Sequence, residues 1–193
     1  MKLRTLAVVA VLTLATLAAH AQVGLYLNPV ANRVSNSVDA GPFAFLGQNS
    51  TSQVFYGYTL GGYDDLYHVG SLSAGFDVRL SDQHANNAML RSFLVGARVS
   101  GKPFARPIKP YAQLSFGYGT TKAPASTIHL SKFDYILYGG VDYTLQKHVD
   151  WRVAEIGYGS VTTISSADIG GGGNLAVPAA KQISFCSGLV FHF

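Results

Sequence analysis

The sequence predicts an all-β fold: a single antiparallel, eight-stranded, up-and-down transmembrane β-barrel behind a cleaved signal peptide. Three observations support this prediction. They are an apolar leader, a two-residue alternation of apolar and polar side chains, and an aromatic last strand. Charged residues make up only 12% of the chain, about half the share usual in a soluble domain, whose outer face must be solvated. An outer wall with few charges suits a barrel that lipid surrounds.

The leader has the features of an export signal. A short basic start is followed by an apolar run and then by Ala19-His20-Ala21, a small-residue cleavage site. We therefore divide the chain into a signal peptide at 1–21 and an outer-membrane β-barrel domain at 22–193. Removal of the leader's two basic residues lowers the formal net charge from +4 to about +2. This small charge argues against a nucleic-acid partner, which would need a basic face.

The alternation predicts the strands, because successive side chains of a strand point to opposite faces. In the clearest run, Phe76, Val78 and Leu80 share one face, whereas Asp77 and Arg79 share the other. Runs of this kind predict eight strands, at about residues 23–34, 53–66, 69–81, 88–100, 109–121, 131–146, 149–163 and 182–193.

The predicted connections alternate in length. The short set is 67–68, 101–108 and 147–148, and the longer set, rich in Ser, Asn, Thr and Gly, is 36–52, 82–87, 122–130 and 164–181. Short turns on one side and longer loops on the other are typical of outer-membrane barrels. An even number of strands then places both termini on the short-turn side, which would face the periplasm.

The last predicted strand carries a nearly unbroken apolar row. Phe185, Leu189, Phe191 and the terminal Phe193 share one face, and Ser187 alone departs from the pattern. A soluble chain rarely ends on such a strand, because an exposed apolar edge invites aggregation. The pattern resembles the terminal strand of bacterial outer-membrane barrels, which the barrel-assembly machinery recognises. The resemblance makes that machinery an expected partner.

The polar face distinguishes the membrane barrel from its alternative, a soluble secreted lipocalin-like binding barrel with apolar residues inside. A solvated outer face would carry many Lys and Glu, but Glu155 is the sole glutamate here. Gly, Ser, Thr, Gln and Tyr suit a narrow, crowded interior. Apolar side chains then face lipid, with aromatic rings at the membrane interfaces. We expect outer-membrane lipopolysaccharide and phospholipid around a monomer.

Charges on the inward faces predict an internal ion-pair network. Eight strands enclose an interior that side chains can fill, and buried charges must be paired. The expected members on regular strands are Asp77, Arg79, Arg98 and Asp142. Asp134 also falls on a polar face.

One segment conflicts with regular alternation. Arg152 and Glu155 would lie on opposite faces of a regular strand, and Glu155 would meet lipid. A charge near the membrane midplane costs up to about 2–4 kcal/mol for Arg or Lys, and less for an acid. We therefore expect a β-bulge at Val153-Ala154, which would turn both charged residues inward and pair them.

With these elements in place, the chain resembles small eight-stranded outer-membrane barrels of the OmpA-like transmembrane-domain and OmpX-like type. Segments such as 56–63, Lys109-Pro110-Tyr111, 139–143 and 151–155 resemble a family of outer-membrane β-barrel proteins from acidobacteria. That family has no assigned activity to carry over to this chain. Our leading interpretation is a non-enzymatic barrel in the cell outer membrane. Such a barrel would act structurally, present surface loops, or pass very small solutes as a porin does.

An enzyme is the alternative class. Some eight-stranded barrels deacylate lipid A with a His-x-Ser motif and an acid on the outer surface. His129-Leu130-Ser131 has that spacing, and Glu155 is the available glutamate, but Lys132 stands where the motif has Asn. We expect neither a cofactor nor a metal site, because the histidines show no metal-ligand spacing.

Overall fold

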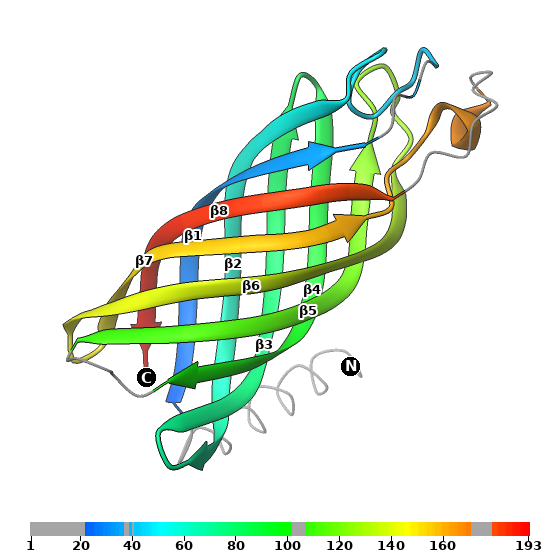
Figure 1. The fold of residues 1–193 in the computed structure, drawn as a ribbon. Coiled ribbons are helices and arrows are strands. Elements are labelled where there is room, and N and C mark those ends of the chain that lie inside the picture. Colours follow the sequence, from blue (N-terminus) through cyan, green and yellow to red (C-terminus); the bar gives the residue numbers. More distant parts are fainter. Residues whose placement is uncertain (1–21, 37–38, 40, 102–106, 171–178) are drawn as a thin grey trace, which may run out of the picture.

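Eight antiparallel strands form a closed barrel in which each strand pairs with its sequence neighbours and the first pairs with the last (Figure 1). The computed structural model describes residues 22–36, 39, 41–101, 107–170 and 179–193, so the predicted signal peptide at 1–21 lies outside the described residues. The strands are β1 (Gln22–Ser35), β2 (Ser52–Val69), β3 (Leu72–Ala85), β4 (Ala88–Gly101), β5 (Ile108–Lys122), β6 (Leu130–Gln146), β7 (Val149–Val161) and β8 (Ala180–His192). The predicted barrel fold is confirmed.

A short 3-10 helix, η1 (Ser166–Ile169), lies in the connection between β7 and β8. No helix among the described residues is long and apolar enough to cross a membrane.

The two ends of the barrel differ. At one, which we call the turn end, β1 begins, β8 ends, and two-residue connections join β2 to β3 and β6 to β7. At the other, the loop end, lie the longer connections 36–51, 123–129 and 162–179. Figure 1 shows the carboxy-terminus at the end opposite these loops. The even number of strands thus places both ends of the barrel sequence at the turn end, as predicted.

One predicted loop is wrong. The segment 82–87 is not a loop, because β3 continues to Ala85 and β4 begins at Ala88. Asn86 and Asn87 form the whole connection, with φ angles of 45° and 64°. Two consecutive positive φ angles define a type I′ hairpin turn, which matches strand twist and which Asn tolerates well. The polar residues before it belong to the strand.

One predicted turn lies further along the chain. The turn expected at 67–68 is at 70–71, because β2 extends to Val69 beyond a register shift between Asp64 and Tyr67. Gly70 supplies the positive φ of 60° that this tight connection requires.

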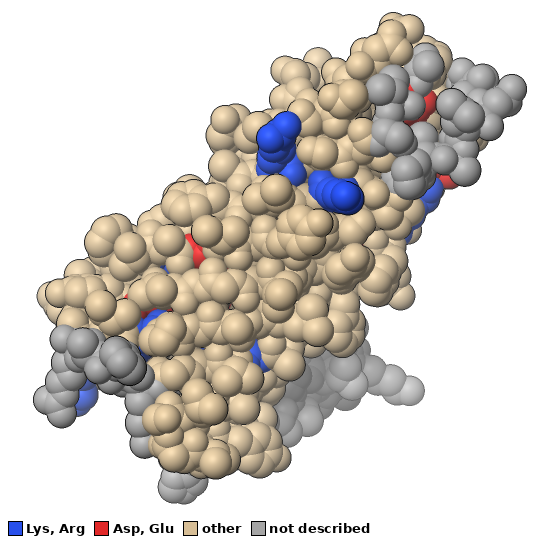
Figure 2. Space-filling view, in the orientation of Figure 1, with Lys and Arg blue, Asp and Glu red and all other residues tan. Residues whose placement is uncertain are grey.

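The side chains are arranged inside out relative to a soluble barrel. Along β5, Leu114, Phe116 and Tyr118 are 50–64% exposed on the outer wall. Gln113 and Ser115, on either side of Leu114 in sequence, are buried inside. Figure 2 shows that few charged side chains lie on the wall in view. This arrangement is the inverse of a lipocalin-like barrel and contradicts the soluble alternative.

Aromatic side chains occur near both ends of the outer wall. Tyr56, Tyr118 and Tyr135 are exposed toward the loop end, and Tyr143 and Trp151 are exposed toward the turn end. Amphipathic rings of this kind are favoured at membrane–water interfaces.

An apolar cluster, which we call the loop-end plug, fills the interior at the loop end. Its buried members are Val34, Phe45, Leu46, Phe55, Ala88, Leu90, Ala123, Val161, Ile164 and Ala180. Phe45, from the connection between β1 and β2, stacks on Phe55 of β2 with ring centroids 5.2 Å apart. The described part of this connection therefore packs into the barrel mouth.

Candidate functional site in the barrel interior

The structure brings the six predicted charged residues together in the interior. They are Asp77 and Arg79 of β3, Arg98 of β4, Asp142 of β6, and Arg152 and Glu155 of β7. Each side chain is at most 3% exposed. The set holds three arginines and three carboxylates, so the formal charges balance. We call these six residues the ion-pair network.

Arg79 joins one half of the network. Its guanidinium makes a bidentate contact with Glu155, with Nη1–Oε1 at 2.6 Å and Nη2–Oε2 at 2.9 Å. Its Nε donates to the Tyr26 hydroxyl at 2.9 Å, and that hydroxyl donates to Asp77 at 2.8 Å. The fork of arginine matches a carboxylate edge to edge, which makes such a pair stronger than a single contact.

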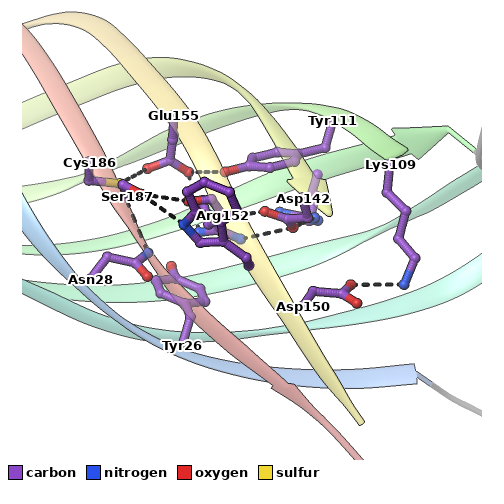
Figure 3. Close-up of polar contacts among 12 residues, drawn as sticks. Tyr26, Asn28, Lys109, Tyr111, Asp142, Asp150, Arg152, Glu155, Cys186 and Ser187 are labelled. Atoms are coloured by element: carbon purple, nitrogen blue, oxygen red, sulfur yellow. Dashed lines mark hydrogen bonds and ion pairs between the residues drawn. The ribbon is translucent and has the colours of Figure 1, made fainter. Parts of the chain in front are cut away.

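Arg152 joins the other half. Its Nε donates to Asp142 Oδ1 at 2.9 Å, and its Nη1 lies 3.4 Å from Glu155 Oε2. Figure 3 shows Arg152 between these two carboxylates. Arg98 Nη2 donates to Asp142 Oδ2 at 3.3 Å. Charges of alternating sign therefore form one continuous chain through residues from four strands.

The β-bulge expected at Val153-Ala154 is present. The pairing of β7 with β6 skips Val153, and its pairing with β8 shifts register between Arg152 and Glu155. Val153 is 36% exposed on the outer wall, whereas Arg152 and Glu155 are buried. One extra residue thus changes the phase of the alternation and turns both charges inward.

Ser187 of β8 completes this bulge. Its hydroxyl donates to the Arg152 carbonyl oxygen at 2.9 Å and accepts a hydrogen bond from Trp151 Nε1 at 3.2 Å. A bulge interrupts the ladder, and an unpaired carbonyl next to lipid is costly. The single polar interruption of the apolar row on β8 therefore has a structural cause.

Sequence reasoning missed the neutral residues that complete the network. Tyr111 donates to Glu155 at 2.6 Å, and Gln113 donates to Asp77 at 2.7 Å. The thiol of Cys186 donates to Glu155 at 3.1 Å. These contacts satisfy carboxylate oxygens that the arginines alone leave with spare capacity.

The arginines also lie against aromatic rings. Arg98 is 4.0 Å from the centroid of Tyr63 and 3.8 Å from that of Tyr111, and Arg79 is 4.0 Å from that of Tyr138. Desolvated cation–π contacts of this kind are favourable. The sequence signal that could have indicated these contacts is the presence of tyrosines at inward-facing strand positions. The interior of a membrane barrel does not need apolar side chains, so an aromatic ring there suggests a specific contact.

Buried carboxylates outside the network also lie on both sides of it. Toward the loop end, Asp134 accepts hydrogen bonds from Ser92 at 2.6 Å and from Gln182 at 2.5 Å. Toward the turn end, Asp150 binds Lys109 at 2.8 Å. The interior thus continues as a polar, hydrogen-bonded layer on both sides of the network.

The interior leaves little room for a solute. A cavity of about 20 Å³, lined in part by Arg79 and Glu155, lies toward the loop end. Such a volume holds about one water molecule. A larger cavity of about 220 Å³ lies toward the turn end and is lined in part by Arg98 and Asp142. The network lies between these two spaces.

The residues of the enzyme alternative do not form one site. His129 is exposed in a connection at the loop end, and Ser131 is exposed on the outer wall, where its hydroxyl lies 2.7 Å from that of Thr120. Glu155 is inside the barrel and binds two arginines. Glu155 therefore does not supply the acid of a triad with His129 and Ser131.

The predicted assembly signal is on the outer wall. Phe185, Leu189, Phe191 and Phe193 are 41–76% exposed. Recognition of this row by the assembly machinery stays a prediction.

The closed barrel, its polar interior and its apolar wall define a class, that of the small eight-stranded outer-membrane β-barrels. One solved structure with this fold is Neisserial surface protein A, which is 16% identical, with 89% of this chain and 97% of that chain covered and a TM-score of 0.57. Another is Ail, the attachment invasion locus protein of Yersinia pestis, in complex with the heparin analogue sucrose octasulfate. It is 11% identical, with 90% of this chain and 99% of that chain covered and a TM-score of 0.55. Comparisons with family models and with curated proteins found no match. The predicted resemblance to small outer-membrane barrels is confirmed at the level of the fold.

Proposed function

We propose that this chain is an integral outer-membrane barrel that is closed to solutes, presents its loops at the cell surface and has no catalytic role. The observation that carries the proposal is the inverted arrangement of side chains, with an apolar outer wall around a charged interior. Exposed apolar surface on this scale is not stable in water and matches the lipid-facing band of a membrane barrel. The fold shared with Neisserial surface protein A and Ail supports the proposal.

The filled lumen favours a structural role over a porin-like one. The ion-pair network occupies the interior, and the loop-end plug lies between it and the loops. A solute would have to break several buried ion pairs and displace packed apolar side chains. Eight-stranded barrels generally have interiors that side chains fill.

The orientation follows from the two ends of the barrel. The turn end, with short connections, faces the periplasm, and the loop end faces the cell exterior. The barrel-assembly machinery recognises the outward row that ends at Phe193, and the barrel functions as a monomer in lipopolysaccharide and phospholipid.

Gel mobility of the outer-membrane fraction, unboiled against boiled in SDS, tests membrane insertion. A closed barrel resists SDS in the cold, so we expect a heat-dependent shift. Recovery in the soluble periplasmic fraction without a shift would contradict the proposal.

Planar-bilayer recording of the purified barrel tests closure. We expect no stepwise conductance at neutral pH. Steady channels would restore the porin-like alternative and would show that the network opens.

Mass spectra of lipid A from cells with and without the protein test the absence of catalysis. We expect an unchanged acyl pattern. Lipid A that lacks an acyl chain in cells with the protein, but keeps it in cells with the Ser131→Ala variant, would establish the deacylase alternative instead.

A further inference from the structure

The outward-facing lysine and arginine side chains of the described strands all lie at the loop end. They are Arg33 of β1, Arg91 of β4, Lys122 of β5 and Lys181 of β8. Toward the turn end, by contrast, Lys109 turns inward to Asp150. In the proposed orientation, these cations are level with the headgroups of the outer leaflet.

Two of these cations are neighbours that have no acidic partner among the described residues. Across the β1–β8 pairing, Arg33 faces Ile183 and Lys181 faces Ser35, so the two basic residues are diagonal neighbours on adjacent strands. Diagonal pairs have Cα atoms roughly 7–8 Å apart, within reach of long side chains. No ion pair joins Arg33 or Lys181 to any described residue, and Figure 2 shows two basic side chains near each other on this wall. The pair can therefore converge on one external anion.

Arg91 provides a contrast on the far side of the rim. Its Nε lies 3.1 Å from Asp82 Oδ1, so its charge is already paired. The next outward positions on β4 are the bulky Phe93 and Val95, both exposed. Lys122 of β5 is a diagonal neighbour of Arg91 and forms no ion pair with a described residue, so the contrast lies in the paired charge of Arg91 and the bulky outward side chains beneath it.

Below Arg33, the wall is hollowed. The next outward positions on β1 are Ala31 and Pro29, which are small, while Tyr56 of β2 and Phe185 of β8 stand on either side. Together with neighbouring residues they line an open groove of about 340 Å³ whose lining is mainly apolar. Its size and chemistry suit a segment of an acyl chain.

We propose that this wall binds one phosphorylated glycolipid of the lipid A class, with a phosphate between Arg33 and Lys181 and an acyl chain in the groove beneath. Ala31 is two residues from Arg33, which at about 3.3 Å per residue separates the phosphate site from the groove by roughly 7 Å. That distance matches the separation between a lipid headgroup and the start of its acyl chain. The inference rests on the proposed function, which places the loop end in the outer leaflet.

The chemistry favours a phosphate monoester on a glycolipid over a phospholipid diester. A monoester carries a charge of about −1.5 to −2 near neutral pH, which two unpaired cations match, and arginine binds phosphate oxygens in a bidentate manner. A diester carries a single negative charge and would leave one of the cations unmatched.

Native mass spectrometry of the purified barrel, released from micelles containing diphosphoryl lipid A, tests the proposal. We expect one retained lipid. Each cation near an anionic lipid contributes roughly a fivefold gain in affinity, so Arg33→Gln with Lys181→Gln should weaken retention by roughly 25-fold. Ala31→Leu fills the groove with both charges intact and should also weaken it. Arg91→Gln is the matched control and should change retention by less than about twofold.

Three outcomes would overturn the inference. Equal weakening by Arg91→Gln would show general attraction to a basic rim. Equal retention of phosphatidylglycerol or of dephosphorylated lipid A would show that the monoester is not the determinant. Unchanged retention in the double variant would show that these cations do not bind the lipid. The heat-dependent gel shift of each sample separates the two proposals, because a barrel that shifts but retains no lipid A contradicts only this inference.

Discussion

The middle of the lumen and its loop end are both filled with buried side chains, but different forces hold the two fillings. The ion-pair network depends on charge: Arg152 lies between Asp142 and Glu155, and each needs the others because all three side chains are buried. The loop-end plug depends on apolar burial, as in the stacking of Phe45 on Phe55. Removal of one member should therefore leave an uncompensated charge in the network but only a void in the plug.

The largest expected effect comes from breaking the network at Arg152. Arg152→Met removes the cation between two carboxylates and leaves both with fewer partners in a buried site. We expect a loss of about 3–5 kcal/mol in the free energy of unfolding. Urea titration in micelles, followed by mobility of the unboiled band, measures it.

The exposed Arg91→Met is the control for loss of an arginine, and we expect less than about 1 kcal/mol there. Adding Glu155→Gln to Arg152→Met should recover part of the loss, because one buried negative charge is removed with its partner. An effect at Arg152 no larger than that at Arg91 would contradict the network's role in stability.

In the plug, Leu90→Ala tests the apolar side of the comparison. Leu90 is fully buried, and truncation of a buried leucine costs about 2–5 kcal/mol, depending on how far the cavity collapses. The same urea titration applies. Leu114→Ala, on the lipid-facing wall, should cost less because acyl chains refill the space.

Planar-bilayer recording further distinguishes the ion-pair network from the loop-end plug. Leu90→Ala should leave the barrel non-conducting, because the network beneath remains intact. Ion conductance in this variant alone would mean that the plug, rather than the network, is the barrier.

A smaller effect is expected where the network meets the wall. Ser187→Ala removes the hydroxyl that donates to the Arg152 carbonyl oxygen at the bulge. A buried acceptor left without a partner costs about 1–3 kcal/mol. Ser187→Thr keeps the hydroxyl and should retain most of the stability. Amide exchange around Val153 should accelerate only in the alanine variant.

Alternation made the network's membership predictable but not its pairing. A period of two places Asp77 and Arg79 inward whatever their partners. Which carboxylate Arg79 reaches depends on register between distant strands, and the structure pairs it bidentately with Glu155. The bulge was predictable because a regular strand would place Glu155 in lipid. The role of Ser187 was not predictable, because it depends on the strand register that the bulge produces.

The loop end was less predictable for a different reason. Residues 82–87 have a loop-like polar composition, yet outward Asp82 lies 2.9 Å from His84 and 3.1 Å from Arg91 at the strand ends. Phe45 and Leu46 have no period that assigns them to the interior, and their burial depends on how the connection folds back. Periodicity describes strands, and it cannot place the segments that cap them.

The smallest expected effect concerns an ion pair outside the barrel, which contrasts with the buried ones. Asp168 of η1 accepts hydrogen bonds from Lys132 at 2.7 Å and from the backbone N–H and the hydroxyl of Ser165, each at 2.8 Å. Partial burial acts to raise the pKa of Asp168, but these hydrogen bonds outweigh it and hold the pKa below its ordinary value. Because the pKa of Asp168 is lowered, its contact with Lys132 stabilises this connection fully at any pH above the ordinary pKa range of aspartate.

The stabilisation is therefore lost only as pH falls through the lowered pKa of Asp168. Asp168→Asn should speed proteolysis of the connection between β7 and β8 at pH 7 by about fivefold or less, since a solvent-exposed pair contributes at most about 1 kcal/mol. Lys132→Gln should match it. The unboiled band should keep its urea midpoint in both, because the barrel does not depend on this contact. A lowered midpoint would show that the exposed pair supports the barrel as the buried ones do, and the distinction between the two kinds of ion pair would fail.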